Sequence, residues 1–406
     1  MSIFGPPNVQ NMKSHRDVKG LVRALDYRGK DRDAIKQSAV RALGELKDPS
    51  AAAPLIACMR VTAWEDQKAI VDALVMIGPP VVDALIKALS DENGTIRSRA
   101  ALALRQLHDE RAVMPLIEAL RVEKDEKIRS WIINSFGVLG DTRAVEPLIE
   151  ALNDPGENNR NLAIECLGIL RDRKAFEPLT GVINQKTSNE KTRGLAMKAL
   201  VQLGDPTTVD FLAGLIKKKT TKKDLRILAI EALGELRDAR AVDLLGGILN
   251  DRTANVEFRN AAVNALVKIG SPTSEALITF AVKNKDENRL VDLLIDLLIQ
   301  NLLRSGGPWH RDELIEIFCR IGAPAGELLV ETFEYNRHET TEMQILANAL
   351  IQLYQRKALS AGAKKKLLAF REMIVSEHTD TIDYDVPSCQ GGQSHIDKGI
   401  GLDFPL

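Results

Sequence analysis

The sequence predicts an all-α fold in which short helices stack in pairs as an α-solenoid. Large apolar residues recur every 30 to 33 positions, at Leu43, Leu74, Leu104, Phe136, Leu167, Leu200, Leu233 and Leu266, and such a period is typical of repeat architectures. Hydrophobic residues make up 45% of the chain but aromatic residues only 4%, so Leu, Ile, Val and Ala must form the core. The alternating pattern of strands is missing. We expect about ten helix pairs.

The repeat is clearest in Arg129–Leu152, RSWIINSFGVLGDTRAVEPLIEAL. It contains the end of an amphipathic helix, a Leu-Gly-Asp turn, and a new helix that carries Pro147 in its first turn. A proline is tolerated there because the first N–H groups of a helix have no partner inside the helix. We call the recurring large apolar residue, here Phe136, the anchor of its repeat; it lies in the second helix of each pair.

Four regions are expected along the chain. Residues 1–16 are predicted to form a short irregular N-terminal arm, and residues 17–303 the regular repeats. Residues 304–376 are predicted to contain irregular repeats and a capping helix that begins at Ala361, with the next anchor at Phe318, 52 residues after Leu266. Residues 377–406 lose the helical period and are predicted to be an extended, non-helical tail.

Two charged positions recur with the repeat. Seven residues before the anchor stand Arg97, Arg129, Arg160, Arg193, Arg226 and Arg259, and five residues after it stand Asp48, Asp109, Asp141, Asp172, Asp205 and Asp238. We interpret each Asp as the N-cap of the following helix and expect Arg and Asp to pair between neighbouring repeats. A ligand surface would vary from repeat to repeat, so this constancy favours a structural role.

The pattern A-L-G-x-L-x-D-x-x-A-V-x-P-L-I, found at Ala232–Leu245 and Ser135–Ile149, resembles the HEAT-like repeats of the phycobilisome-lyase (E–Z) type. The resemblance covers roughly residues 17–355 and implies a right-handed superhelix whose second helices line a concave surface. Relatives include bilin lyase subunits, scaffold proteins and an iron-dependent peptidyl-lysine hydroxylase. Only His338-Glu339 matches the His-Glu metal ligands of the hydroxylase, so we exclude a di-iron centre of that kind.

The second helices leave one stripe of positions free to vary, at six before, two before and two after the anchor. These offsets are four residues apart and therefore share a helix face. The stripe is least polar in the middle of the chain, as in a protein-binding groove. The partner-binding residues predicted there, including one residue beside the stripe, are Leu102, Ser130, Trp131, Asn134, Val138, Asn161, Glu165, Ile169 and Lys198. The alternative is that neighbouring helices partly cover these side chains.

The function predicted from these features is a non-enzymatic scaffold or adaptor, expected as a monomer, that binds another protein or peptide. One alternative is a subunit of the bilin-lyase kind, or a chaperone, that holds a chromophore or a protein substrate. Another is nucleic-acid binding through the Lys217–Lys223 loop, but a net charge of −1 and the absence of interleaved aromatic residues favour a solvated turn.

The tail contains a possible zinc-ligand set, His378, Cys389, His395 and Asp397. Two imidazoles, a thiolate and a carboxylate suit tetrahedral zinc, but their spacing matches no standard zinc finger. A flexible tail, or a strap docked on the last helices, is the simpler interpretation, so no cofactor is expected. Four widely separated cysteines favour the cytoplasm. The lack of an 18-residue apolar run or a secretory leader argues against export and membrane insertion.

Overall fold

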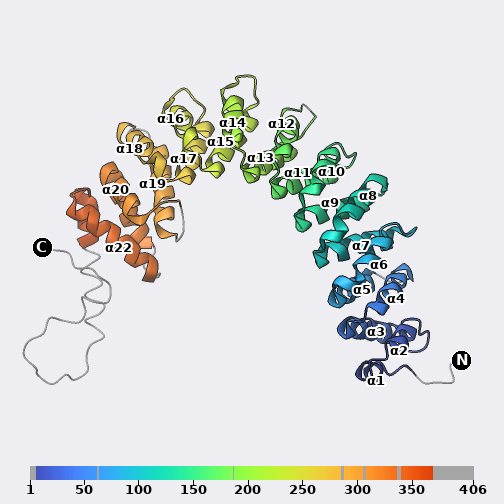
Figure 1. Cartoon of the computed structure of the whole chain (residues 1–406). Coiled ribbons are helices and arrows are strands. Elements are labelled where there is room, and N and C mark those ends of the chain that lie inside the picture. The colour runs from blue at the N-terminus through green and yellow to red at the C-terminus, as the bar shows by residue number, and fades with distance from the viewer. Residues whose placement is uncertain are drawn as a thin grey trace, which may run out of the picture. The chain divides into compact units, whose positions relative to one another are not determined.

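The structure is a computed structural model that describes residues 6–61, 64–185, 187–284, 288–304, 308–335 and 340–368. Within these ranges the regular elements are helices, and no strand occurs among them (Figure 1). The predicted all-α solenoid of stacked helix pairs is confirmed. The chain divides into two compact units, Met1–Asp205 and Pro206–Leu406.

Each repeat of the first unit pairs a first helix with a second helix that packs on the second helices of its neighbours. The first helices are α2 (Val18–Leu25), α4 (Ala52–Cys58), α6 (Val82–Ala88), α8 (Val113–Val122), α10 (Val145–Ala151) and α12 (Phe176–Asn184). The second helices are α3 (Arg32–Leu46), α5 (Trp64–Ile77), α7 (Gly94–Leu107), α9 (Glu126–Leu139), α11 (Glu157–Leu170) and α13 (Glu190–Leu203). Within this unit the second helices follow the inner side of the curve and the first helices its outer side (Figure 1).

Short 3-10 helices lead into most of the first helices. They are η1 (Pro49–Ala51), η3 (Pro79–Val81), η4 (Glu110–Ala112), η5 (Thr142–Ala144) and η6 (Arg173–Ala175), while η2 (Met59–Val61) follows α4. The predicted aspartate caps are confirmed: in five repeats the carboxylate accepts a hydrogen bond from the backbone N–H two residues further on, at Asp48, Asp109, Asp141, Asp172 and Asp238. Asp205 instead is buried and pairs with Arg173 at 3.0 Å. The caps satisfy N–H groups that the helix itself cannot.

The N-terminal arm is not irregular throughout. Val9–Ser14 forms helix α1, which is capped by the side chain of Asn8 and packs against α2 and α3. The sequence missed it because six residues are too few to show a helical period.

The anchors form the centre of the core. All eight side chains, from Leu43 to Leu266, have no solvent exposure. They sit where adjacent second helices meet, in the contacts of α3 with α5, α5 with α7, α7 with α9, α9 with α11, and α11 with α13. Burial of one leucine contributes about 2 kcal/mol, so a row of such contacts holds the repeats together.

Glycine directly after the anchor lets several second helices approach closely. A Cβ atom on Gly44 would lie 2.9 Å from the Cα of Ala73, and one on Gly168 would lie 2.8 Å from the Cα of Ala199. On Gly137 it would lie 2.9 Å from the Sγ of Cys166. Only hydrogen fits in these places without displacing the neighbouring helix.

The second unit continues the pairing. Its helices are α14 (Thr207–Lys217), α15 (Lys223–Leu236), α16 (Val242–Asn250), α17 (Val256–Ile269), α18 (Ser274–Lys283), α19 (Asn288–Leu303), α20 (Arg311–Ile321), α21 (Ala323–Tyr335) and α22 (Thr340–Gln355), with η7 (Ala239–Ala241) and η8 (Ser271–Thr273). Residues 361–368 are helical where the capping helix is predicted to begin. The rest of that helix and the tail at 377–406 lie outside the described residues, so the four predicted regions stay predictions.

The interpretation of Phe318 as the next second-helix anchor is wrong. Helix α19 packs against α17 and α21, whereas α20, which carries Phe318, packs against α18 and α22. Leu298 in α19 follows Leu266 by 32 residues and is fully buried, so the interval contains an ordinary second helix. The indole of Trp309 then donates to the carbonyl of Val267 at 2.8 Å and fastens the start of α20 to α17.

No single helix of the described residues is long and apolar enough to span a membrane. Two consecutive segments, Gln67–Ile77 and Pro79–Ala88, are together long and apolar enough to span a membrane, but the chain bends by 114° between them.

We predict opposite effects for alanine at two glycines of adjacent helices. Gly168→Ala should lower the free energy of unfolding by about 1–3 kcal/mol because its methyl group has no space against Ala199. Gly194→Ala in α13, where a Cβ would meet nothing within 4 Å, should be neutral or stabilise by up to about 1 kcal/mol. Urea unfolding measures both, and equal shifts for the two variants would refute the close approach.

Candidate functional site

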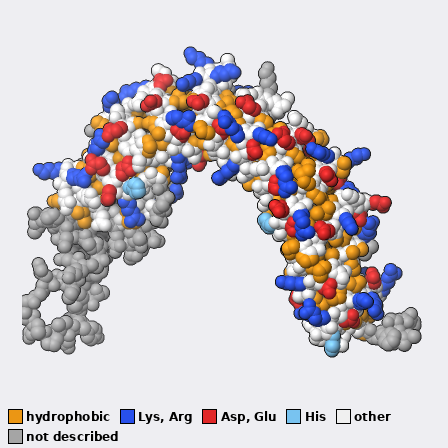
Figure 2. Space-filling view, in the orientation of Figure 1, with side chains coloured by type: hydrophobic (Ala, Val, Ile, Leu, Met, Phe, Trp, Pro, Cys, Tyr) orange, Lys and Arg blue, Asp and Glu red, His pale blue; other side chains and the backbone are white. Residues whose placement is uncertain are grey.

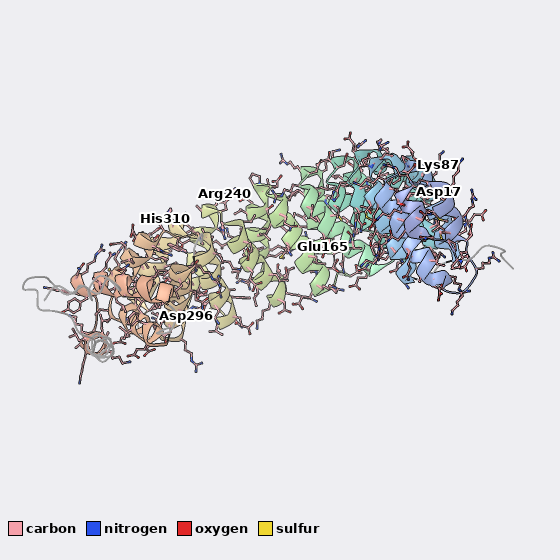
Figure 3. The ribbon with its side chains drawn as sticks, turned by 90° about the horizontal axis from the view of Figure 1, so that it is seen from below. Asp17, Lys87, Glu165, Arg240, Asp296 and His310 are labelled. Carbon is pink, nitrogen blue, oxygen red and sulfur yellow. The ribbon has the colours of Figure 1, made fainter. Side chains whose placement is uncertain are left out.

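The candidate site is the inner face of the second helices in the first unit, where the predicted partner-binding residues lie. Figure 3 shows the side chains of these helices, with Glu165 of α11 labelled. Four of the predicted side chains, Val138, Glu165, Ile169 and Lys198, are exposed, and Leu102 of α7 is half-buried. This face therefore carries exposed charged side chains on α11 and α13 and apolar side chains on α7, α9 and α11.

Exposed apolar side chains recur two residues after the anchor. Val138 of α9 is 41% exposed and Ile169 of α11 is 52% exposed, and Met76 of α5 occupies the same repeat position at 40%. Large apolar side chains at equal positions of neighbouring helices form a row. We call Val138, Ile169 and the half-buried Trp131 the apolar ridge.

Arg105 joins the ridge to α7 and was not found from the sequence. Its Nη1 donates to the Oδ1 of Asn134 at 2.9 Å, and its Cζ lies 5.9 Å from the centre of the Trp131 ring. Arg105 directly follows its anchor, where Gly137 stands in the next repeat. A charged residue at this position of close helix approach was the signal that could have identified it. The cation thus lies over the indole ring, and such a cation–π pair contributes about 0.5–1 kcal/mol.

Two predicted binding residues belong to the scaffold instead. Asn161 is only 7% exposed, and its Oδ1 accepts from the hydroxyl of Thr192 at 2.9 Å. Ser130 is half-buried; its hydroxyl donates to the Oδ1 of Asn159 at 2.5 Å and accepts from the Nδ2 of Asn158 at 3.2 Å. The position six residues before the anchor thus faces the next second helix. The alternative of partly covered side chains holds for these two residues.

Asn159 of α11 forms buried hydrogen bonds that link α11 to α9. Its side chain has no exposure, and its Nδ2 donates to the carbonyl of Glu126 and to Asp154 at 3.2 and 3.1 Å. Buried amides are costly unless paired. Its partners, together with Ser130, satisfy this amide, so it is not available to bind a ligand.

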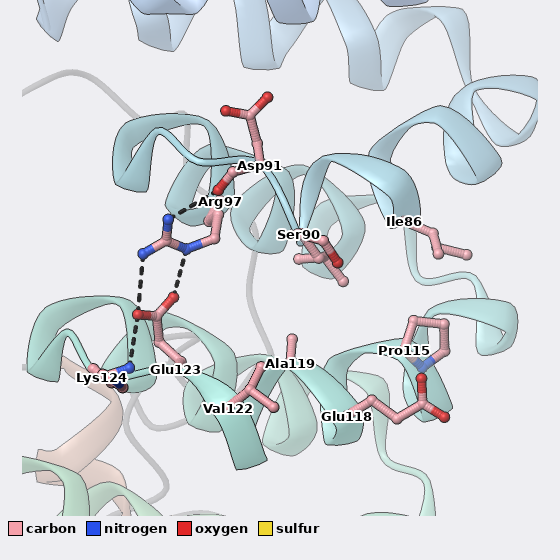
Figure 4. Close-up of a pocket in the computed structure, with 11 residues that line it drawn as sticks. Ile86, Ser90, Asp91, Arg97, Pro115, Glu118, Ala119, Val122, Glu123 and Lys124 are labelled. Atoms are coloured by element: carbon pink, nitrogen blue, oxygen red, sulfur yellow. Dashed lines mark hydrogen bonds and ion pairs between the residues drawn. The ribbon is translucent and has the colours of Figure 1, made fainter.

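Two of the recurring arginines, Arg97 and Arg129, pair with carboxylates other than the capping aspartates that the sequence predicted as their partners. The Nε and Nη2 of Arg97 bind Glu123 at 2.7 and 3.1 Å (Figure 4), and those of Arg129 bind Asp154 at 2.8 and 3.2 Å. Glu123 and Asp154 lie in the loops that enter the next second helices. The prediction used the wrong carboxylates for these two arginines because the loop between the first and second helices of the next repeat, not the cap, faces the guanidinium.

The capping aspartates have their own partners. Arg111, Arg143 and Arg240 each bind the cap two residues before them at 2.6–2.7 Å. Arg111 and Arg143 also reach a backbone carbonyl of the preceding repeat, that of Pro79 at 3.0 Å and that of Glu110 at 3.4 Å.

The Arg97–Glu123 and Arg129–Asp154 pairs, which we call the arginine ladder, shift the pKa values of all four side chains. Burial alone would raise the pKa of Glu123 and of Asp154, but hydrogen bonds from Arg97 and Arg129 and from backbone N–H groups bring both pKa values below their ordinary range. The same side-chain hydrogen bonds raise the pKa of Arg97 and Arg129. Both pairs are therefore ionised in the folded protein at neutral pH.

The described part of the first unit contains at least two open pockets. One, of about 570 Å³, lies between α6 and α8; Ile86, Pro115, Ala119 and Val122 line it, and the Arg97–Glu123 pair closes one end (Figure 4). The other, of about 440 Å³, lies between α1 and α3. Both lie away from the apolar ridge.

The described residues offer little catalytic chemistry. Cys166 is buried, which raises the pKa of its thiol to about 11, so it is a core residue and not a nucleophile. The described residues contain no group of three or more His, Cys, Asp and Glu that could hold a metal ion. The candidate ligands His378, Cys389, His395 and Asp397 lie outside them. In the Lys217–Lys223 loop, Lys223 is paired with Glu257 at 2.6 Å.

The sequence matches HEAT repeats over residues 62–137, 113–190, 145–222 and 218–291, and a PBS lyase HEAT-like repeat over residues 35–60. The matches to HEAT repeats together span residues 62–291, more than half of the chain. The comparison with curated proteins gives no match.

Several solved structures have a similar arrangement of helices. The complex of CpcE and CpcF of phycocyanin lyase from Nostoc sp. PCC7120 matches at 21% identity over 59% of this chain and 93% of that chain, with a TM-score of 0.34. The YibA protein of Escherichia coli matches at 22% identity over 63% and 94%, with a TM-score of 0.38. Yeast importin-β (Kap95p) matches at 13% identity over 92% and 56%, with a TM-score of 0.44.

We predict that Glu123→Gln lowers the free energy of unfolding by about 2 kcal/mol at neutral pH, because it weakens a charged hydrogen bond that is mostly shielded from water. A lowered folded-state pKa stabilises the protein above the unfolded value of about 4.3. The difference from the unchanged chain should therefore shrink as the pH falls below about 4. Glu118→Gln, at an exposed position of α8, should change stability by less than about 0.5 kcal/mol. Denaturant unfolding across pH measures this, and a difference that grows in acid would contradict it.

Proposed function

Because the chain belongs to the HEAT-repeat proteins, we propose that it is a non-enzymatic scaffold that binds another protein through the inner face of its first unit. The observation that carries the proposal is the apolar ridge on the adjacent helices α9 and α11, in which Val138 and Ile169 are exposed and Trp131 is half-buried. Apolar side chains that stay in water at equal positions of successive repeats gain free energy when a partner covers them.

Charged side chains surround the ridge. Glu165 and Lys198 are exposed on α11 and α13, and Arg105 lies on the α7 side. An apolar centre with a charged rim is the usual composition of a protein-binding patch. Both signs of charge are present, so the rim favours a partner of mixed charge.

The preferred ligand is an amphipathic helix. Packed helix axes lie about 8–10 Å apart, and residues seven apart in a partner helix are about 10.5 Å apart, which matches the step from Val138 to Ile169. An extended peptide would need side chains that hydrogen-bond to its backbone. The Oδ1 atoms of Asn134 and Asn161 and the Nδ2 of Asn159 are already engaged within the unit, so few side-chain groups remain for a peptide backbone. A helix satisfies its own backbone and needs only the apolar face.

A second candidate function is that of a bilin-lyase-like subunit that holds a chromophore or a protein substrate. The match of residues 35–60 to a PBS lyase HEAT-like repeat favours it. It predicts that a bilin added to the purified chain shifts its visible absorbance. An unchanged spectrum, with the bilin removed by gel filtration, would exclude chromophore binding.

The scaffold proposal is tested by capture of partners from the native cell lysate. We compare the unchanged chain with Trp131→Ala plus Ile169→Glu, and with Met114→Glu, which alters an exposed side chain of α8 away from the ridge. A partner retained by the unchanged chain and by Met114→Glu should be lost at least about 30-fold by the ridge variant, the equivalent of about 2 kcal/mol. Circular dichroism checks that all three are folded.

A photo-crosslinking residue at position 138 then identifies the contact. Crosslinking to the retained partner, and mapping of the crosslink to an amphipathic helix of that partner, would support the ridge. If all three chains recover every partner equally, the assignment of the inner face is wrong.

A further inference from the structure

Three successive recurring arginines of the first unit, Arg97, Arg129 and Arg160, donate hydrogen bonds to backbone carbonyls in the same way. The Nη1 of Arg97 donates to the carbonyls of Asp91 and Glu92 at 2.9 and 3.1 Å. The Nη1 of Arg129 reaches the carbonyls of Lys124 and Glu123 at 2.7 and 3.5 Å. The Nη1 of Arg160 reaches those of Asp154 and Pro155 at 2.7 and 2.9 Å. These bonds fix each guanidinium against the loop that enters its own helix.

The remaining edge of the guanidinium forms a fork of two donors, Nε and Nη2. In Arg97 and Arg129 this fork holds a carboxylate in bidentate fashion, from Glu123 and Asp154 respectively. These carboxylates stand 19 and 18 residues after their anchors. A fixed fork of this kind matches the geometry of a carboxylate.

The acid is missing in the next repeat. Eighteen residues after the anchor Leu167 stands Gln185, which has no carboxylate. Among the described residues, which do not include residue 186, no carboxylate is found on the Nε or Nη2 of Arg160. The guanidinium of Arg160 is thus held by the backbone like those of Arg97 and Arg129, but it lacks the carboxylate that binds their Nε and Nη2.

A second arginine lies at the same loop. The Nη2 of Arg193 donates to the carbonyl of Gln185 at 2.9 Å. Its Nε is buried and has no hydrogen-bond partner among the described residues. A buried N–H without a partner is costly, so a small shift of this guanidinium toward an entering anion would relieve that cost. The nearby carboxylate of Glu157 is held by the Nδ2 of Asn189 at 2.8 Å.

We propose that Arg160 and Arg193, on either side of Gln185, form a subsite for a carboxylate side chain of a partner protein. The partner's Asp or Glu takes the place that Glu123 and Asp154 occupy in the preceding repeats. Arg160 lies on α11, the helix that also carries Ile169 of the apolar ridge, and Arg193 lies on the next second helix, α13, so the subsite adds a polar anchor to the proposed protein binding. It rests on the proposed function only in taking the ligand to be a protein.

The test uses fluorescein-labelled hexaglutamate and the full chain, with binding followed by fluorescence anisotropy at low ionic strength, where such contacts are strongest. Gln185→Glu supplies an internal carboxylate to the fork and should weaken binding about 10-fold or more. It should also raise the midpoint of urea unfolding. Arg160→Ala should weaken binding to a similar extent. Gln185→Asn, which adds no charge, should bind as the unchanged chain does.

Two further variants separate this subsite from other surfaces. Trp131→Ala removes part of the ridge and should leave hexaglutamate binding unchanged, so failure of the ridge does not affect the result. Lys218→Ala plus Lys219→Ala removes charge from the basic loop and should have little effect. The proposal is overturned if Gln185→Glu binds like the unchanged chain, or if only the lysine variant loses binding. A phosphoserine peptide that binds more tightly, with the same dependence on Arg160, would overturn the assignment to a carboxylate.

Discussion

The first unit depends on how closely its second helices approach one another. Buried anchors such as Phe136 and Leu167 supply apolar contact, and Gly137 and Gly168 remove the side chains that would keep the helices apart. With this row fixed, the residues two positions after each anchor, such as Val138 and Ile169, lie on another side of the helix and stay exposed. The exposed ridge, the buried amides and the arginine ladder are all consequences of that spacing.

Much of the fold could be predicted from the sequence because its signals are local. Helix period, a cap such as Asp141 and a buried anchor each depend on residues within one repeat. The position of Phe318 was misjudged because first and second helices can both end in an apolar residue followed by glycine, as α20 does at Gly322 and α9 does at Gly140. Which row a helix joins depends on packing between repeats, and one repeat's sequence does not contain that information.

The candidate site was less predictable for the same reason. The exposure of Val138 and Ile169 follows from helix periodicity and agrees with the predicted face. The burial of Asn161 depends on Thr192, which belongs to a different repeat. Arg105 likewise acquires its role only where α9 presents a tryptophan and an amide to it. Contacts between repeats therefore determine which residues of the stripe remain free to bind a partner. The sequence predicts the stripe but not which of its residues are exposed.

The buried polar contacts of α9, α11 and α13 also bear on how this chain could evolve. The hydroxyl of Ser130 needs the amide of Asn159, and the amide of Asn161 needs the hydroxyl of Thr192. Solenoids can lengthen by duplicating a repeat when each interface accepts any neighbour. Here an inserted copy would leave a buried donor or acceptor without its complement. These matched hydrogen bonds therefore favour the present order of the three repeats. We expect gains or losses of whole repeats elsewhere along the chain.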